Sequence, residues 1–152
     1  MAFQGYSLTL DGATQLKDAG AIASSAATQV GGADAVFNVG AAGAFSRFAI
    51  IIDISAINVA TGQYYDLWVQ CSSTSNFSTN YRKATLTVGD TASIAHGSDT
   101  AAGIRLVIYS DNVCQTGTTA DTQECLQYVR LYTNVNGASA SINYTAFLVP
   151  LS

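Results

Sequence analysis

Hydrophobic and polar residues alternate along most of the chain. Within residues 47–54, Phe48, Ile50 and Ile52 occupy every second position, whereas Asp53 belongs to the intervening set of positions. A period of two places successive side chains on opposite faces of an extended strand. The pattern therefore predicts five long strands, at residues 47–54, 65–71, 103–109, 126–135 and 138–149.

Shorter alternating runs and a turn signal add to these strands. Residues 6–10, 35–39 and 82–88 predict three further strands, which brings the expected total to about eight. Asn136-Gly137 lies between two alternating runs, and this dipeptide favours the type I′ turn of a β-hairpin. We therefore expect the two strands on either side of it to pair directly.

Helix signals are weak, and no linker divides the chain. Residues 18–29 are rich in Ala, Ser and Thr but lack an apolar stripe at helical spacing, so an extended connection or a short helical turn is expected there. Many short strands joined by turns are typical of sandwiches and barrels. We expect residues 1–152 to form a single domain, an all-β antiparallel β-sandwich of jelly-roll type with negligible helix.

On several predicted strands, the face opposite the more apolar one, called the second face here, also carries apolar side chains. A face exposed to solvent would carry more polar side chains. Two-layer packing and long loops would cover these side chains in a monomer. Alternatively, part of the face is a subunit interface, because contiguous exposed apolar patches mark association sites. The residues concerned are Ile51, Trp68, Val107, Leu131, Phe147 and Val149.

Composition and charge narrow the function classes. Hydrophobic residues make up 49% of the chain and charged residues only 11%, whereas about 25% is usual for charged residues. The net charge of −4 argues against nucleic-acid binding through a basic stripe. Residues 1–6 lack the features of a signal peptide, and the longest apolar run, residues 48–52, is too short for a membrane span. We expect a soluble protein made in the cytoplasm, with no nucleic-acid or membrane partner.

Catalytic signals are nearly absent. His96 is the only histidine, and Ser93, Ser98 and Asp99 lie near it in a stretch rich in Gly and Ser. A catalytic histidine needs a nucleophile and an orienting acid that converge on it, and neighbours in a loop are more typical of a solvated side chain. One His and three scattered Cys do not make a zinc site. We therefore expect no enzymatic activity and no cofactor.

The carboxylates and cysteines have simpler explanations. Asp53 and Asp66 fall on the outer faces of predicted strands, as solvated charges do. Asp111, Asp121 and Glu124 contain oxygen ligands suited to calcium but lack a calcium-loop pattern, so no metal site is expected. Cys71 lies in a strand and is expected to be a buried thiol. Cys114 and Cys125 bracket a polar loop and could pair in a disulfide across its base, although a reducing cytoplasm disfavours this.

Aromatic residues gather in one part of the chain. They could form a platform on which a sugar ring stacks, or they could fill a β core or an interface, which is the commoner use of such rings. One alternative function is therefore that of a carbohydrate-binding module or of a tail-fibre-associated protein. The residues concerned are Tyr64, Tyr65, Trp68, Phe77 and Tyr81.

Several short segments resemble one family of small phage proteins. Residues 67–73 form an alternating strand that ends in Gln-Cys-Ser and leads to Asn76-Phe77. Residues 128–132, Tyr-Val-Arg-Leu-Tyr, precede a Gly turn and a final apolar strand, and residues 21–30 supply an Ala/Ser/Thr segment ahead of the first long strand. This pattern resembles the capsid cement (decoration) proteins of tailed bacteriophages, of the Bordetella-phage type.

The resemblance implies a structure, a partner and a location. It implies a jelly-roll β-sandwich that forms a homotrimer on the outside of the virion, where it stabilises the head by bridging subunits of the major capsid protein. The chain differs from the family in the insertion between Cys114 and Cys125 and in lacking Asp-Leu-Gly after the Ala/Ser segment.

The N-terminal segment, residues 1–10, is the candidate contact with the capsid. An apolar terminus outside the main sandwich can be ordered by a partner, although the same residues also suit an ordinary edge strand. The candidate contact residues are Phe3, Tyr6, Leu8 and Leu10.

Overall fold

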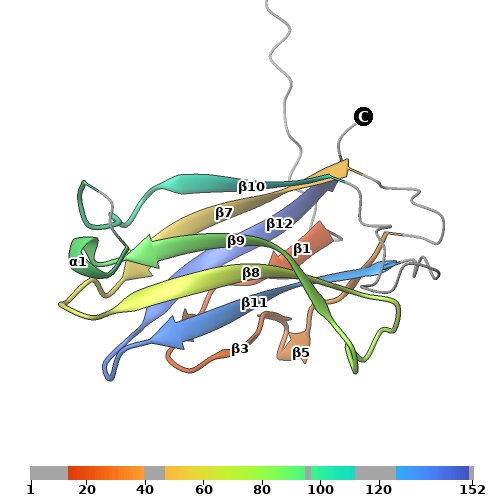
Figure 1. Cartoon of the computed structure of the whole chain (residues 1–152), viewed down its shortest axis with the longest axis horizontal. Coiled ribbons are helices and arrows are strands. Elements are labelled where there is room, and N and C mark those ends of the chain that lie inside the picture. The colour runs from red at the N-terminus through yellow and green to blue at the C-terminus, as the bar shows by residue number, and fades with distance from the viewer. Residues whose placement is uncertain (1–13, 40–46, 95–96, 112–125, 151–152) are drawn as a thin grey trace, which may run out of the picture.

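The computed structural model describes residues 14–39, 47–94, 97–111 and 126–150 (Figure 1). Most of their strands form two antiparallel β-sheets that pack face to face, and two short strands pair separately. The only helix among the described residues, α1 (Thr91–Ile94), has four residues. The expected all-β antiparallel sandwich with negligible helix is therefore confirmed. The predicted strand at residues 6–10 lies outside the described residues.

The first sheet, called sheet A here, contains four strands in one path. Its order is β1–β12–β7–β10, and the short strand β2 also pairs with β12. Strand β7 is central and hydrogen-bonds to β12 on one side and to β10 on the other. The bounds are β1 (Gln15–Lys17), β2 (Ala21–Ile22), β7 (Arg47–Ile57), β10 (Arg105–Asp111) and β12 (Ile142–Pro150).

The second sheet, sheet B, faces the inner side of sheet A. Its order is β3–β11–β8–β9, the short strand β6 also pairs with β11, and β4 and β5 pair separately. The predicted strand at residues 35–39 shortens to β6, and the Ala-rich stretch forms short strands rather than helix. The bounds are β3 (Ala26–Ala27), β4 (Gln29–Val30), β5 (Ala33–Asp34), β6 (Phe37–Asn38), β8 (Tyr64–Ser72), β9 (Tyr81–Gly89) and β11 (Tyr128–Asn136).

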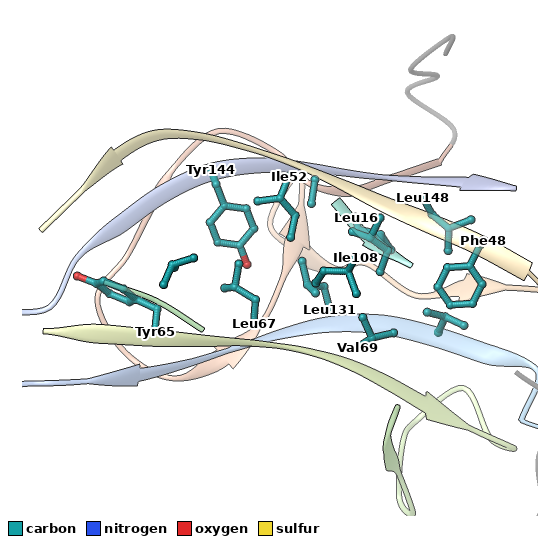
Figure 2. Packing of buried hydrophobic residues seen from close by; sticks show 14 of the residues in the cluster. Leu16, Phe48, Ile52, Tyr65, Leu67, Val69, Ile108, Leu131, Tyr144 and Leu148 are labelled. Carbon is teal, nitrogen blue, oxygen red and sulfur yellow. The ribbon is translucent and has the colours of Figure 1, made fainter. Parts of the chain in front are cut away.

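Side-chain alternation builds the core between the sheets. Phe48 and Ile52 point inward from sheet A, and Leu67 and Leu131 meet them from sheet B (Figure 2). All four are fully buried. Burying a side chain of this size stabilises the fold by about 1.5–3 kcal/mol. The core therefore fixes which residues of each strand face outward.

One predicted pairing is wrong. Asn136-Gly137 does not close a hairpin, because β11 belongs to sheet B and β12 to sheet A. The connection instead crosses between the two layers. Gly137 has a φ of 108°, and a Cβ atom there would collide with the side chain of Gln63 and with the Gly62 carbonyl oxygen. The glycine is therefore needed for a close approach between loops at this end of the sandwich.

A buried pair of hydroxyl groups joins the two sheets. Thr133 of β11 and Tyr144 of β12 lie 2.6 Å apart, oxygen to oxygen, and both residues are fully buried. Figure 2 shows the Tyr144 ring reaching from β12 toward sheet B. Burial raises the pKa of Tyr144, so its hydroxyl is neutral and can donate or accept the bond.

We expect Tyr144→Phe and Thr133→Val each to lower the free energy of unfolding by about 1–3 kcal/mol, because each leaves the other hydroxyl buried without its partner. The double variant should lose less than the sum of the two, since neither hydroxyl then remains. Urea unfolding of the four proteins measures this coupling. Strict additivity would contradict an inter-sheet bond.

Candidate functional site

Two of the residues considered for catalysis, Ser93 and Asp99, are engaged in local hydrogen bonds. His96 lies outside the described residues. The Ser93 hydroxyl donates to Asp90 Oδ2 at 2.6 Å, and Asp99 accepts a bond of 2.8 Å from the backbone N–H of Thr91. The pKa of Asp90 is lowered chiefly by Ser93, and that of Asp99 by Thr91. These two carboxylates hold the turn around α1.

Metal ligands and a membrane helix are also absent from the described part of the chain. No cluster of three or more His, Cys, Asp or Glu residues suited to a metal ion occurs there. None of the described helices is long and apolar enough to cross a membrane. Cys71 is buried as expected, and burial raises the pKa of its thiol to about 12, which keeps it protonated.

Several predicted site residues lie outside the described residues. These are the four N-terminal candidates, the two cysteines of the candidate disulfide and the two acids nearest to them: Phe3, Tyr6, Leu8, Leu10, Cys114, Cys125, Asp121 and Glu124.

The two outward-facing strand acids are engaged in local bonds. Asp53 forms a bidentate pair with Arg105, with Nε–Oδ1 and Nη2–Oδ2 distances of 2.6 and 2.8 Å, and this bonding lowers the pKa of Asp53. Asp66 accepts bonds of 2.8 Å from the Thr87 hydroxyl and 3.0 Å from the Asn134 amide. Both acids therefore organise the sheet surface.

The outer face of sheet A is apolar over three neighbouring strands. Ile51 of β7 lies directly between Val107 of β10 and Phe147 of β12, and the next row is Tyr109–Ala49–Val149. We call these two cross-strand rows the apolar face. Val107 and Tyr109 on the edge strand are exposed to 40% and 70%, respectively, whereas Ile51 and Ala49 at the centre of the face are buried, at 1% and 4%.

The predicted second-face residues divide among three places. Four of the six belong to the apolar face, at Ile51, Val107, Phe147 and Val149. Trp68 faces outward on sheet B. The assignment of Leu131 is wrong, because it is fully buried in the core. The outward-facing residues of β11 include Tyr128 and Tyr132, whose rings give that face apolar character in the sequence as well.

The outer face of sheet B carries a different pattern of side chains. Three residues directly opposite one another, Arg130 of β11, Gln70 of β8 and Arg82 of β9, form what we call the arginine row. The adjacent row contains Tyr132 and Trp68 on the same two strands, β11 and β8. Figure 1 shows the three strands side by side on this face of the sandwich.

Planar groups of the two rows stack on one another. The Trp68 and Tyr132 rings are nearly parallel, at 13°, with centroids 5.5 Å apart. The Arg82 guanidinium carbon lies 3.6 Å from the Trp68 ring centroid, approaching from the strand on the other side of β8. Arg130 lies 5.9 Å from the Tyr132 ring centroid and 4.2 Å from that of Phe77. Cation–π contacts of this kind contribute about 0.5–2 kcal/mol each, depending on burial.

Phe77 anchors one end of this stack. It lies in the β8–β9 loop with a φ of 52°, a backbone conformation that is uncommon outside glycine, and its side chain is only 5% exposed. The Asn76 side chain steadies the turn by accepting bonds from the Ser78 N–H and the Thr74 hydroxyl. The loop thus holds an aromatic ring against Arg130.

The aromatic platform suggested by the sequence is not formed. Tyr65 is fully buried in the core, and Tyr81 packs against the core cluster. The Phe77 side chain is buried, at 5% exposure. Trp68 has Tyr132 and Arg82 on its two sides, so its ring is not open for a sugar to stack on. Its indole Nε1–H is buried and has no hydrogen-bond acceptor among the described residues.

The apolar face offers hydrophobic area, and the arginine row offers hydrogen-bond donors and positive charge. The period-two alternation of the sequence identified most of the apolar face. It missed the arginine row, because Gln70, Arg82 and Arg130 become neighbours only through strand register.

Trp68 is the only tryptophan, so its fluorescence reports directly on the stack. We expect Arg82→Ala to shift its emission to longer wavelength and to increase quenching by acrylamide, because the variant uncovers one side of the indole. Lys83→Ala, which makes the same charge change one residue away, should leave both signals nearly unchanged. Identical spectra for wild type and Arg82→Ala would contradict the contact.

No model of a known protein family matches the chain, and no curated protein matches it. A functional assignment therefore depends on the residue patterns and on the two outer faces described above.

Proposed function

We propose that the protein is a structural virion protein that binds the outer surface of a phage capsid and stabilises the head by bridging subunits of the major capsid protein. In this proposal it has no enzymatic activity, needs no cofactor and acts as a homotrimer with the jelly-roll connectivity of decoration proteins. The resemblance of several strand segments to capsid cement proteins suggests this class. The observation that carries the proposal is the apolar face of sheet A, which suits the contacts between copies that a bridging oligomer needs.

The apolar face is suited to a contact between protein subunits. Its two rows place Val107 and Tyr109 at the surface of the edge strand β10, and the buried Ile51 and Ala49 of β7 separate them from Phe147 and Val149 of β12. The Arg105–Asp53 pair lies in the next row and gives the face a polar border. An apolar centre with a polar rim is the usual anatomy of a protein interface.

A low density of charge also favours protein contacts. Charged residues make up 11% of the chain, and fewer charges need to lose their hydration when a surface is covered. Closed symmetry is the commonest form of self-association. A trimer that engages several capsid subunits at once gains affinity from multivalency, even where each contact is weak. We assign the apolar face to contacts between copies and residues 1–10 to the capsid.

The decisive experiment adds the purified protein to mature, undecorated heads of its own phage. Saturating protein should raise the temperature at which the heads disrupt, because a ligand of the assembled state stabilises that state. Deleting residues 1–10 should weaken binding to the heads while leaving the far-ultraviolet circular dichroism of the sandwich intact. Absence of binding by the full-length protein would refute the assignment, and specific glycan-array hits lost in Trp68→Ala would favour the carbohydrate-binding alternative.

The apolar face has its own test. Tyr109→Asp should shift the protein toward monomer in sedimentation experiments at micromolar concentration, because it places a charge among apolar side chains. Ala60→Asp makes the same charge change in the exposed turn between β7 and β8 and should leave the oligomer intact. Equal sedimentation of both variants and wild type would contradict an interface at this face.

A further inference from the structure

The two arginines of the arginine row lack acidic partners in the described structure. Arg105 pairs with Asp53, and Lys17 donates to the backbone carbonyls of Asp18 and Gly20. By contrast, Arg82 contacts the Trp68 ring, and no carboxylate of the described residues lies within ion-pair distance of it. Two of the protein's six basic residues thus lie in one row without an ion pair to a carboxylate of the described residues.

Arg130 is likewise held without being neutralised. Its Nε donates to Gln70 Oε1 at 2.7 Å, and its guanidinium lies over the Phe77 ring. Asp34 acts on Arg130 through its charge but forms no ion pair with it, and burial lowers the pKa of Arg130. Because arginine titrates far above neutrality, the side chain remains charged. Its terminal N–H groups have no partner among the described residues.

Stacking immobilises both guanidinium groups before any ligand arrives. Ordering a long side chain on binding costs about 0.5–1.5 kcal/mol. Here Trp68 already holds Arg82 and Phe77 already holds Arg130, so much of that cost is met in the folded protein. The two arginines lie opposite Gln70 on the strands to either side of β8. Two interstrand distances therefore separate their Cα atoms, which is about 10 Å.

We propose that the arginine row is a docking site for a protein segment that carries clustered carboxylates. Planar guanidinium groups match carboxylates with two parallel hydrogen bonds. Unpaired positive charge complements an acidic segment, and Trp, Tyr and Arg are the residues enriched at protein-binding hot spots. A polysaccharide is disfavoured because Tyr132 and Arg82 cover the two sides of the Trp68 ring. This inference goes beyond capsid binding and does not depend on it.

Calorimetric titration of the full-length protein with a short peptide of alternating Glu and Ser tests the proposal without any capsid. We expect binding at low ionic strength that weakens as salt is added, and no binding of the matched Gln/Ser peptide. Arg82→Gln/Arg130→Gln should bind the acidic peptide at least about tenfold more weakly, since two charge-assisted contacts are lost. Arg105→Gln, with one positive charge removed from the opposite face, should bind within about twofold of wild type.

Two further measurements keep the result interpretable. Circular dichroism checks that each variant is folded. The second measurement uses Arg82→Lys, at an exposed position, which retains the positive charge but lacks the planar guanidinium group. It should bind at least about threefold more weakly than wild type. The proposal is overturned by no binding of the acidic peptide, by unchanged affinity in the double variant, or by tighter binding of a polyuronate of equal charge. Failure of capsid binding would leave this peptide result unaffected.

Discussion

The burial of two apolar sheet faces against each other is the constraint on which the rest of the structure depends. Because side chains alternate strictly along a strand, placing Leu67 and Val69 in the core forces Trp68 and Gln70 outward. A slip of one residue along β8 would exchange the two sets and turn the charged Asp66 toward the core. The core therefore sets the register, and the register creates both outer faces.

Much of the fold follows from the sequence because its evidence is local. The alternation in β7, β8 and β10 needs only a few neighbouring residues to be recognised, and the structure places these strands where the pattern predicts them. The Asn136-Gly137 signal was also local and correctly marked a change of direction. It could not show whether the next strand pairs with its predecessor or crosses to the other layer, because that choice depends on remote strands.

The candidate surfaces were less predictable for the same reason. Parity alone identifies apolar residues on a second face, as for Val107 and Phe147. It misplaced Leu131, because tyrosine side chains with polar tips serve equally well inside and outside a sheet. The arginine row depends on pairing between residues 70, 82 and 130, and the stack also includes a loop phenylalanine with a positive φ. No spacing in one segment encodes such a neighbourhood.

The alternation of the chain between layers has a consequence for how the protein reaches its native state. Of the six long strands described, only β8 and β9 follow each other within one sheet. Strand β12 inserts between β1 and β7, so sheet A joins segments from opposite ends of the sequence. Such pairings form only after the long chain segment between the two strands has closed into a loop, and closing it costs conformational entropy. On the ribosome, the β8–β9 hairpin can form early, whereas sheet A must wait until β12 has emerged.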